Sequence, residues 1–236
     1  MSAMSALHLV LLIPLAGILL IVIARRHPNI RETVSILTAI MLFASIASLV
    51  PAVLDGMRPA LMLAEPLPGL SLKLTVEPLG MLFALLASLL WIVTTIYSVG
   101  FMRARRETRQ TRFYAFFALS LWATTGIAFA GNLLSLFVFY EVLTLSTYPL
   151  VTHSGTAAAR RGGRVYLGLL LGTSIGLLLL AIIWTWQLAG TLDFRAGGIL
   201  EGAVTPGIAS ILLVLFIFGI GKAAVMPFHM WLPAAM

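Results

Sequence analysis

Apolar residues gather into long runs along this chain, and most polar residues fall in the short stretches between the runs. A membrane-spanning helix needs about 20 predominantly apolar residues, because each residue adds only about 1.5 Å of length. The pattern therefore predicts about seven membrane-spanning helices. They cover residues 5–24, 33–54, 77–101, 113–130, 132–151, 165–189 and 206–232.

The pair Gly131-Asn132 separates the fourth run from the fifth. Such a pair favours a tight turn. A single helix over 113–151 would be far too long for a bilayer, so two spans joined by a turn are the better interpretation. The outer segment 55–76 contains three prolines, and we expect a short hairpin or cap there.

Basic residues alternate between the two sides of the predicted spans. The first, third and fifth connections hold eleven arginines, whereas the second and sixth hold three basic residues. The eleven are Arg25, Arg26, Arg31, Arg103, Arg105, Arg106, Arg109, Arg112, Arg160, Arg161 and Arg164. The positive-inside rule places these basic loops in the cytoplasm and the N-terminus outside. We therefore expect a multi-pass protein of the bacterial plasma (inner) membrane.

Composition agrees with the membrane interpretation. Hydrophobic residues make up 61% of the chain and charged residues 10%, against about 45–50% and about 25% in soluble domains. The net charge of +7 lies in the loops, so it is a topology signal and predicts no nucleic-acid partner. Cysteine is absent, which excludes disulfides and thiolate metal sites. With no metal-type spacing and no phosphate-binding glycine loop, we expect no cofactor.

Two charged residues fall deep within the predicted spans. Glu141 lies near the middle of 132–151, and Lys222 lies past the middle of 206–232. An ionisable group at the bilayer centre costs roughly 2.5–3.5 kcal/mol on insertion scales. The pair is either a buried ion pair that joins two helices or part of an ion pathway, and the cost favours the pathway.

The sequence around Lys222 predicts a broken helix. Gly219 and Gly221 loosen the helix, and Pro227 lacks the amide that would bond to the carbonyl of Ala223. Broken helices occur in membranes where they are buried in protein or line a hydrated cavity. A lysine there is a candidate proton carrier, because apolar surroundings favour its neutral form and a nearby carboxylate favours its charged form.

Four further residues are candidates for a proton path: Thr144, Tyr148, His153 and His229. The threonine and the tyrosine follow Glu141 on the same helical face, where they would hold water or bond to a neighbouring helix. The first histidine ends the fifth span on the cytoplasmic side. The second follows Lys222 along the seventh span and would extend the path inward. The alternative is that neither histidine handles protons.

Two stretches resemble the motifs of a known family. Residues 131–148 read GNLLSLFVFYEVLTLSTY, and residues 219–236 read GIGKAAVMPFHMWLPAAM. They are similar to the fifth helix and the broken seventh helix of the proton-antiporter membrane subunits. This family includes antiporter-like subunits of respiratory complex I, large subunits of Mrp-type cation/proton antiporters and membrane subunits of energy-converting hydrogenases. The resemblance starts near residue 77 and also covers IYSVGFM and RFYAFF.

The resemblance implies the N-terminal half of an all-α fold in which two inverted repeats supply about fourteen helices. We expect 1–76 to form the first two helices and an outer loop, and 77–236 to form the translocation core, truncated after the seventh helix. The conserved glutamate and lysine of the family correspond to Glu141 and Lys222. The chain departs from the family at Ala234, where many members carry an acidic residue.

The resemblance also implies a proton-translocating subunit that works with other membrane subunits. Two modes stay open: cation/proton exchange of the Mrp type, with sodium as a candidate ion, and redox-driven pumping in an NADH-quinone oxidoreductase or hydrogenase. The chain has no iron–sulfur cysteines and no nucleotide motif, so redox chemistry would belong to its partners. The alternative is a structural scaffold subunit that conducts nothing.

Overall fold

The computed structural model describes residues 3–235 and confirms the predicted class, an all-α polytopic membrane protein, to which it adds a small β-hairpin. The chain divides into two compact units. The first unit holds the described residues up to Leu61 together with Leu74–Ala130. The second holds Met62–Lys73 and the described residues from Gly131 onward.

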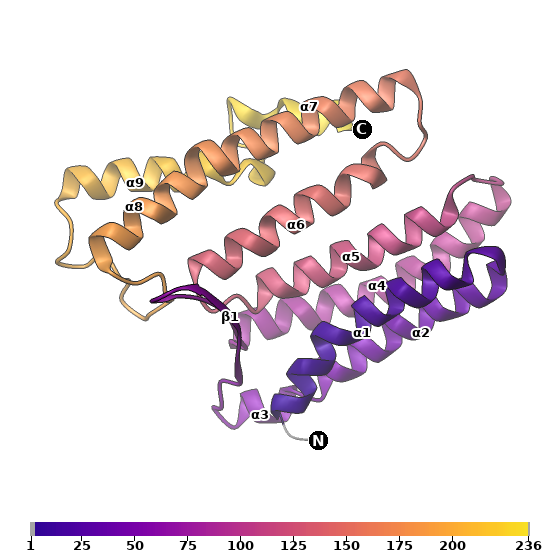
Figure 1. The fold of residues 1–236 in the computed structure, drawn as a ribbon, viewed down its shortest axis with the longest axis horizontal. Helices are drawn as coiled ribbons and strands as arrows, with labels where there is room; N and C mark the ends of the chain where they lie inside the picture. Colours follow the sequence, from indigo (N-terminus) through magenta and orange to yellow (C-terminus); the bar gives the residue numbers. More distant parts are fainter. Residues whose placement is uncertain (1–2, 236) are drawn as a thin grey trace. The chain divides into compact units, whose positions relative to one another are not determined.

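The first unit is a helical bundle. Its helices are α1 (Ala3–Ile23), α2 (Pro28–Ala47), α3 (Val50–Leu54), α4 (Pro78–Ala104) and α5 (Gln110–Ala128) (Figure 1). Pro28 and Pro78 begin α2 and α4 at the first helical position, where a missing amide removes no helical hydrogen bond. Helix α1 packs against α2 and α5, and α2 packs against α4. Gly17 permits the approach of α1 to α2, because a Cβ there would meet the side chain of Thr38.

The second unit carries the broken helices. Its helical elements are α6 (Leu133–Val151), α7 (Ala157–Thr173), a π-helix (Ser174–Leu178), α8 (Leu179–Ala189), α9 (Pro206–Gly219), two 3₁₀ segments (Gly221–Ala223 and Phe228–Met230) and α10 (Trp231–Ala235). The π-helix joins α7 and α8 into one long span. The hairpin expected in 55–76 is present as β1 (Ala60–Leu67) and β2 (Leu70–Thr75).

The helices match the predicted spans with two differences. Each predicted run contains a helix, and five helical stretches within residues 3–235 are long and apolar enough to cross a membrane. Helix α9 has only 14 residues, and α5 is not among the five, so the count of seven is approximate. The spans also extend further than predicted. Helix α7 begins at Ala157, so Arg160, Arg161 and Arg164 lie on a helix and not in a loop.

The start of α6 is held by the hairpin. Asn132 caps the helix, since its side-chain oxygen accepts the Ser135 amide at 2.8 Å and its Nδ2 donates to the Ser71 carbonyl at 2.6 Å. The Lys73 amide donates to the Ser135 hydroxyl at 2.7 Å. The Lys73 ammonium pairs with Asp193 at 2.6 Å, which ties the hairpin to the loop after α8. The predicted turn at 131–132 is therefore bonded to the hairpin and to the first turn of α6.

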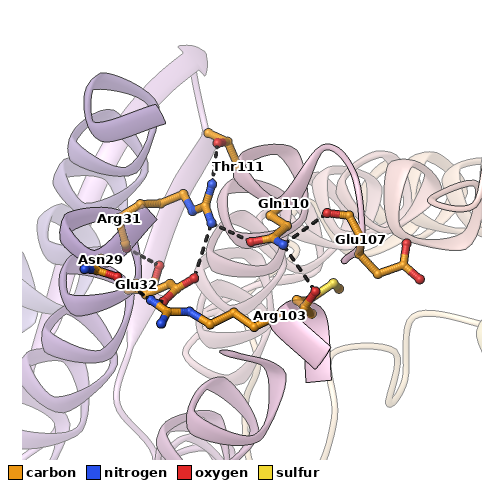
Figure 2. Close-up of polar contacts among 9 residues, drawn as sticks. Asn29, Arg31, Glu32, Arg103, Glu107, Gln110 and Thr111 are labelled. Carbon is orange, nitrogen blue, oxygen red and sulfur yellow. Dashed lines mark hydrogen bonds and ion pairs between the residues drawn. The ribbon is translucent and has the colours of Figure 1, made fainter. Parts of the chain in front are cut away.

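Two buried charged residues, Arg31 and Glu32, hold helices together at one end of the first unit (Figure 2). We predict that this end faces the cytoplasm. Glu32 is 3% exposed and pairs with both Arg31 and Arg103. Arg31, itself 5% exposed, also donates to the side chains of Gln110 at 2.6 Å and Thr111 at 3.2 Å. The network joins α2, α4 and the start of α5. The prediction that Arg31 lies in a loop was wrong, because α2 begins at its first proline and carries the arginine into the bundle.

Replacing Glu32 by Gln would leave the Arg31 guanidinium buried without its carboxylate. We expect the free energy of unfolding to fall by about 3–5 kcal/mol, the range for breaking a buried ion pair. Denaturation of the detergent-solubilised protein measures this loss.

The matched control is Glu77→Gln, because Glu77 pairs with Arg58 at 3.0 Å in an exposed ion pair of the same unit. Its expected cost is below about 1 kcal/mol. Equal losses in the two variants would show that the buried network adds nothing beyond an ordinary surface pair.

Candidate functional site

Glu141 lies within an uninterrupted helix, α6, and its carboxylate is enclosed by protein. Both carboxylate oxygens are buried, and neither makes a hydrogen bond of ordinary geometry within residues 3–235. The side chains of Ser174 and Lys222 lie near enough to interact with it. Ser174 is the first residue of the π-helix. Burying a carboxylate with so few hydrogen-bond partners costs free energy.

The helix break around Lys222 is present, but it starts earlier than the predicted proline. Helix α9 ends at Gly219, and Lys222 follows in the short 3₁₀ segment. Ala224 then adopts the left-handed region with φ of 52°. Pro227 follows a cis peptide bond at the end of the break. The predicted helix-breaking residues Gly221 and Pro227 therefore both lie in the irregular segment.

Glycine allows this segment to pack closely on the neighbouring span. A Cβ at Gly219 would lie 2.6 Å from the backbone nitrogen of Leu178, at the end of the π-helix. A Cβ at Gly221 would meet the hydroxyl of Thr173, which directly precedes the π-helix. Any larger residue at either position would push the break away from the span that carries Ser174.

Lys222 is held by α6 through two residues. Its Nζ donates to the Thr144 hydroxyl at 2.5 Å and lies 4.6 Å from the centre of the Tyr140 ring. Its backbone amide donates to the Tyr140 hydroxyl at 3.0 Å. The Trp231 indole donates to the carbonyl of Gly221 at 2.8 Å. Both polar groups of the peptide between Gly221 and Lys222 thus bond to side chains.

The structure brings Glu141 and Lys222 together without a direct ion pair. Their charges interact, but among the described residues no contact of 4.0 Å or less joins the carboxylate to the ammonium. The ammonium faces a hydroxyl and an aromatic ring. The arrangement can therefore hold a proton on the lysine while leaving the carboxylate a short movement away.

The other predicted residues lie around this centre. Thr144 contacts Lys222 directly. Tyr148 lines a surface hollow of about 450 Å³ together with arginines of α7, and His153 follows the end of α6. His229 lies in the second 3₁₀ segment, where its Nδ1 is buried without a hydrogen-bond partner in the described chain. Neither Tyr148 nor His229 bonds to Glu141 or Lys222 in that part of the chain.

The site also contains three residues that were not predicted from the sequence: Tyr140, Ser174 and Trp231. Tyr140 has a usable signal, because it precedes Thr144 by one helical turn and so shares its stripe. The serine and the tryptophan have none, since only the packing of the second unit brings them to Glu141 and Gly221. Within residues 3–235 no cluster of three or more His, Cys, Asp or Glu is positioned to hold a metal ion.

Comparison with known families places this geometry in context. Residues 130–236 match the family described as NADH:quinone oxidoreductase/Mrp antiporter, transmembrane region. This part of the chain is thus an antiporter-like membrane region. The resemblance to the proton-antiporter membrane subunits is confirmed, and the matched region contains both Glu141 and Lys222.

Curated relatives of this antiporter-like chain include a hydrogenase component and a subunit of a cation/proton antiporter. Hydrogenase-4 component B of Escherichia coli is 28% identical over 173 residues, covering 73% of the chain and 25% of the relative. A Na(+)/H(+) antiporter subunit of Alkalihalophilus pseudofirmus is 27% identical over 229 residues, covering 94% of the chain and 45% of the relative. The chain thus spans less than half the length of either relative.

A solved structure shares the fold. The antiporter-like chain matches a subunit of the membrane-bound sulfane sulfur reductase, an archaeal respiratory membrane complex, with a TM-score of 0.81. The two sequences are 23% identical, and the match covers 98% of this chain and 36% of the other. At this identity the likeness establishes the fold alone.

Replacing Gly219 by Ala tests the close approach at the helix break. We expect the free energy of unfolding to fall by about 1–3 kcal/mol, because the added methyl group overpacks against the Leu178 backbone. Denaturation of the solubilised protein measures the change.

Gly172→Ala on α7 is the control, since a Cβ there meets nothing within 4 Å in the described structure. Alanine favours a helix over glycine by about 1 kcal/mol, so this variant should be neutral or slightly more stable. If both variants lost the same stability, the contact between the break and the π-helix would not be a packing constraint.

Proposed function

We propose that the chain is the part of a longer subunit that translocates protons across the membrane, using Glu141 and Lys222. The core would be 77–236, with the basic loops in the cytoplasm and the N-terminus outside. Other membrane subunits would be its partners. This proposal goes beyond the family match of residues 130–236 by assigning roles to individual residues.

The observation that carries the proposal is the state of the Glu141 carboxylate. Its two oxygens are buried, make no hydrogen bond of ordinary geometry in the described chain and lie close to the half-buried Lys222. Ionisable residues inside membranes are expensive and mark ion or proton pathways more often than simple packing. A structural ion pair would gain most by closing into direct contact, whereas these two groups are held apart.

Proton transfer would follow from a change in the separation of the two charges. When the ammonium of Lys222 approaches Glu141, attraction keeps its proton in place. When the carboxylate is protonated or moves away, the apolar surroundings favour loss of the proton from Nζ to a water molecule or an acceptor further along the membrane. The lysine then becomes a neutral amine, ready to accept the next proton.

Two coupling modes are compatible with this mechanism. One is exchange of protons for a cation such as sodium, as the name of the Alkalihalophilus relative states for that protein. The other is pumping driven by redox chemistry in partner subunits, as in an NADH-quinone oxidoreductase or a hydrogenase. The geometry of the Glu141–Lys222 centre suits both, since it handles the proton and leaves the driving reaction elsewhere.

The second candidate is a scaffold subunit that conducts nothing. It is supported by the networks around Arg31 and Lys73, in which charged residues join segments of this chain and form no proton site. This candidate assigns the same anchoring purpose to the Glu141–Lys222 centre. The two functions differ in what a substitution at the centre damages.

Glu141→Gln and Lys222→Ala, made in the complete subunit, should each reduce transport to the level of membranes lacking the protein, because each removes one charge of the pair. The amount of assembled complex should stay at the level of the unmodified protein. Proton or cation flux in inverted membrane vesicles measures the first quantity, and native gels measure the second.

Glu201→Gln is the control, since Glu201 is an exposed carboxylate outside the helices of the second unit. It should transport at the unmodified rate. Normal flux in either central variant would refute the mechanism, and loss of assembly without loss of flux per complex would favour the scaffold.

A further inference from the structure

The ammonium of Lys222 occupies a defined position on α6. Thr144 and Tyr140 are one helical turn apart, so their side chains form one stripe along the helix. The ammonium lies across this stripe, 2.5 Å from the Thr144 hydroxyl and 4.6 Å from the Tyr140 ring centre. Both residues are buried, with Thr144 fully enclosed. A flexible lysine side chain is therefore held at one place beside Glu141.

The Thr144 hydroxyl is oriented to accept from the lysine. Its own proton is donated to the Tyr140 carbonyl at 3.0 Å. A hydroxyl has one donor and two acceptor lone pairs, so the lone pairs of Oγ1 are left for the lysine Nζ. A valine of the same shape would keep the packing and remove the acceptor.

Tyr140 holds both the backbone and the side chain of the lysine. Its hydroxyl accepts the Lys222 amide, which fixes the helix break. Its ring face attracts a cation, and this attraction strengthens where the cation is removed from water. The ring therefore favours the protonated lysine at this position, while the hydroxyl fixes where the side chain begins.

We propose that Thr144 and Tyr140 form a docking site that holds the ammonium of Lys222 away from Glu141, and that the lysine moves between this site and the carboxylate during transport. The inference rests on the proposed proton-translocating function and adds two positioning residues to it. Neither residue exchanges a proton with the transported pool. Each determines where the ammonium is held when it is away from Glu141, and how readily it is released.

The docking site also attracts the ammonium, but more weakly than the carboxylate does. A hydroxyl and a ring bind a cation, yet neither carries the full opposite charge that would trap it. Ser174 lies near the Glu141 carboxylate in the same way. Each charge therefore keeps a neutral polar neighbour when the pair is open.

The main test compares Thr144→Val with Thr144→Ser in the complete subunit, within its complex. Thr144→Val should lower flux about ten-fold at unchanged assembly, the size expected for losing a hydrogen bond to a charged group. Its pH of half-maximal flux should move to lower pH, because the ammonium without its acceptor releases the proton more easily. Thr144→Ser keeps the hydroxyl and should stay within about two-fold of the unmodified protein in flux, with the same pH profile.

The matched control is Thr185→Val on α8. Thr185 is buried, and its hydroxyl has no hydrogen-bond partner in the described chain, so the same substitution there removes no contact. Flux and pH profile should both be unchanged. The titratable groups around the docking site are Glu141 and Tyr140 on α6 and Tyr166 on α7, and all three are kept in these variants.

Tyr140 supplies a second test that does not depend on how Thr144→Val folds. Tyr140→Phe keeps the ring and loses the hydroxyl, whereas Tyr140→Leu loses both. The leucine variant should lower flux about ten-fold per assembled complex and shift the pH profile, and the phenylalanine variant should keep the unmodified pH profile.

The outcomes separate this inference from the function on which it rests. Normal flux in Glu141→Gln or Lys222→Ala would refute the transport function itself. If those variants are inactive while Thr144→Val and Tyr140→Leu keep normal flux and pH profiles, the docking site is refuted and the function stands. Equal defects in Thr144→Ser and Thr144→Val would also overturn the docking site, because the hydroxyl would then not matter.

Discussion

The candidate site depends on satisfying the backbone of a helix that breaks inside a membrane. Lipid offers no hydrogen bonds, so the amide and carbonyl groups released at the break must find partners in the protein. Tyr140 accepts the Lys222 amide, and Trp231 donates to the Gly221 carbonyl. These two bonds hold the peptide group that directly precedes the lysine side chain. Because the backbone is fixed against α6, the lysine side chain can reach only a few positions for its ammonium.

The spans and the two central charges were predictable because each is a local property of the sequence. Hydropathy finds a span without reference to its neighbours, and a charge inside a span stands out on its cost alone. The turn at Gly131-Asn132 and the break near Gly221 follow from residue types that favour turns or interrupt helices. The motifs that resemble the antiporter family lie on these same elements, so the two lines of inference agreed.

The partners of the charges were not predictable, because they depend on which helices pack together. Tyr140 shares a helical stripe with Thr144, but nothing in the sequence places Lys222 against its ring. The π-helix that begins at Ser174 has no distinctive sequence, yet it lies where the break packs most closely. Arg31 and Glu32 looked like loop residues because a hydropathy run excludes charged positions, although the helix itself starts before them.

Two buried carboxylates in this chain, those of Glu32 and Glu141, differ in the partners that surround them. Glu32 lies between two arginines and forms a charge-assisted ion pair with each of them. Glu141 has no such clamp, and its lysine is held by a hydroxyl and a ring. A group exchanges protons readily only when its charged and neutral forms are close in free energy. On that ground we assign the proposed proton chemistry to the second unit, whereas the buried ion pairs of Glu32 join helices of the first unit.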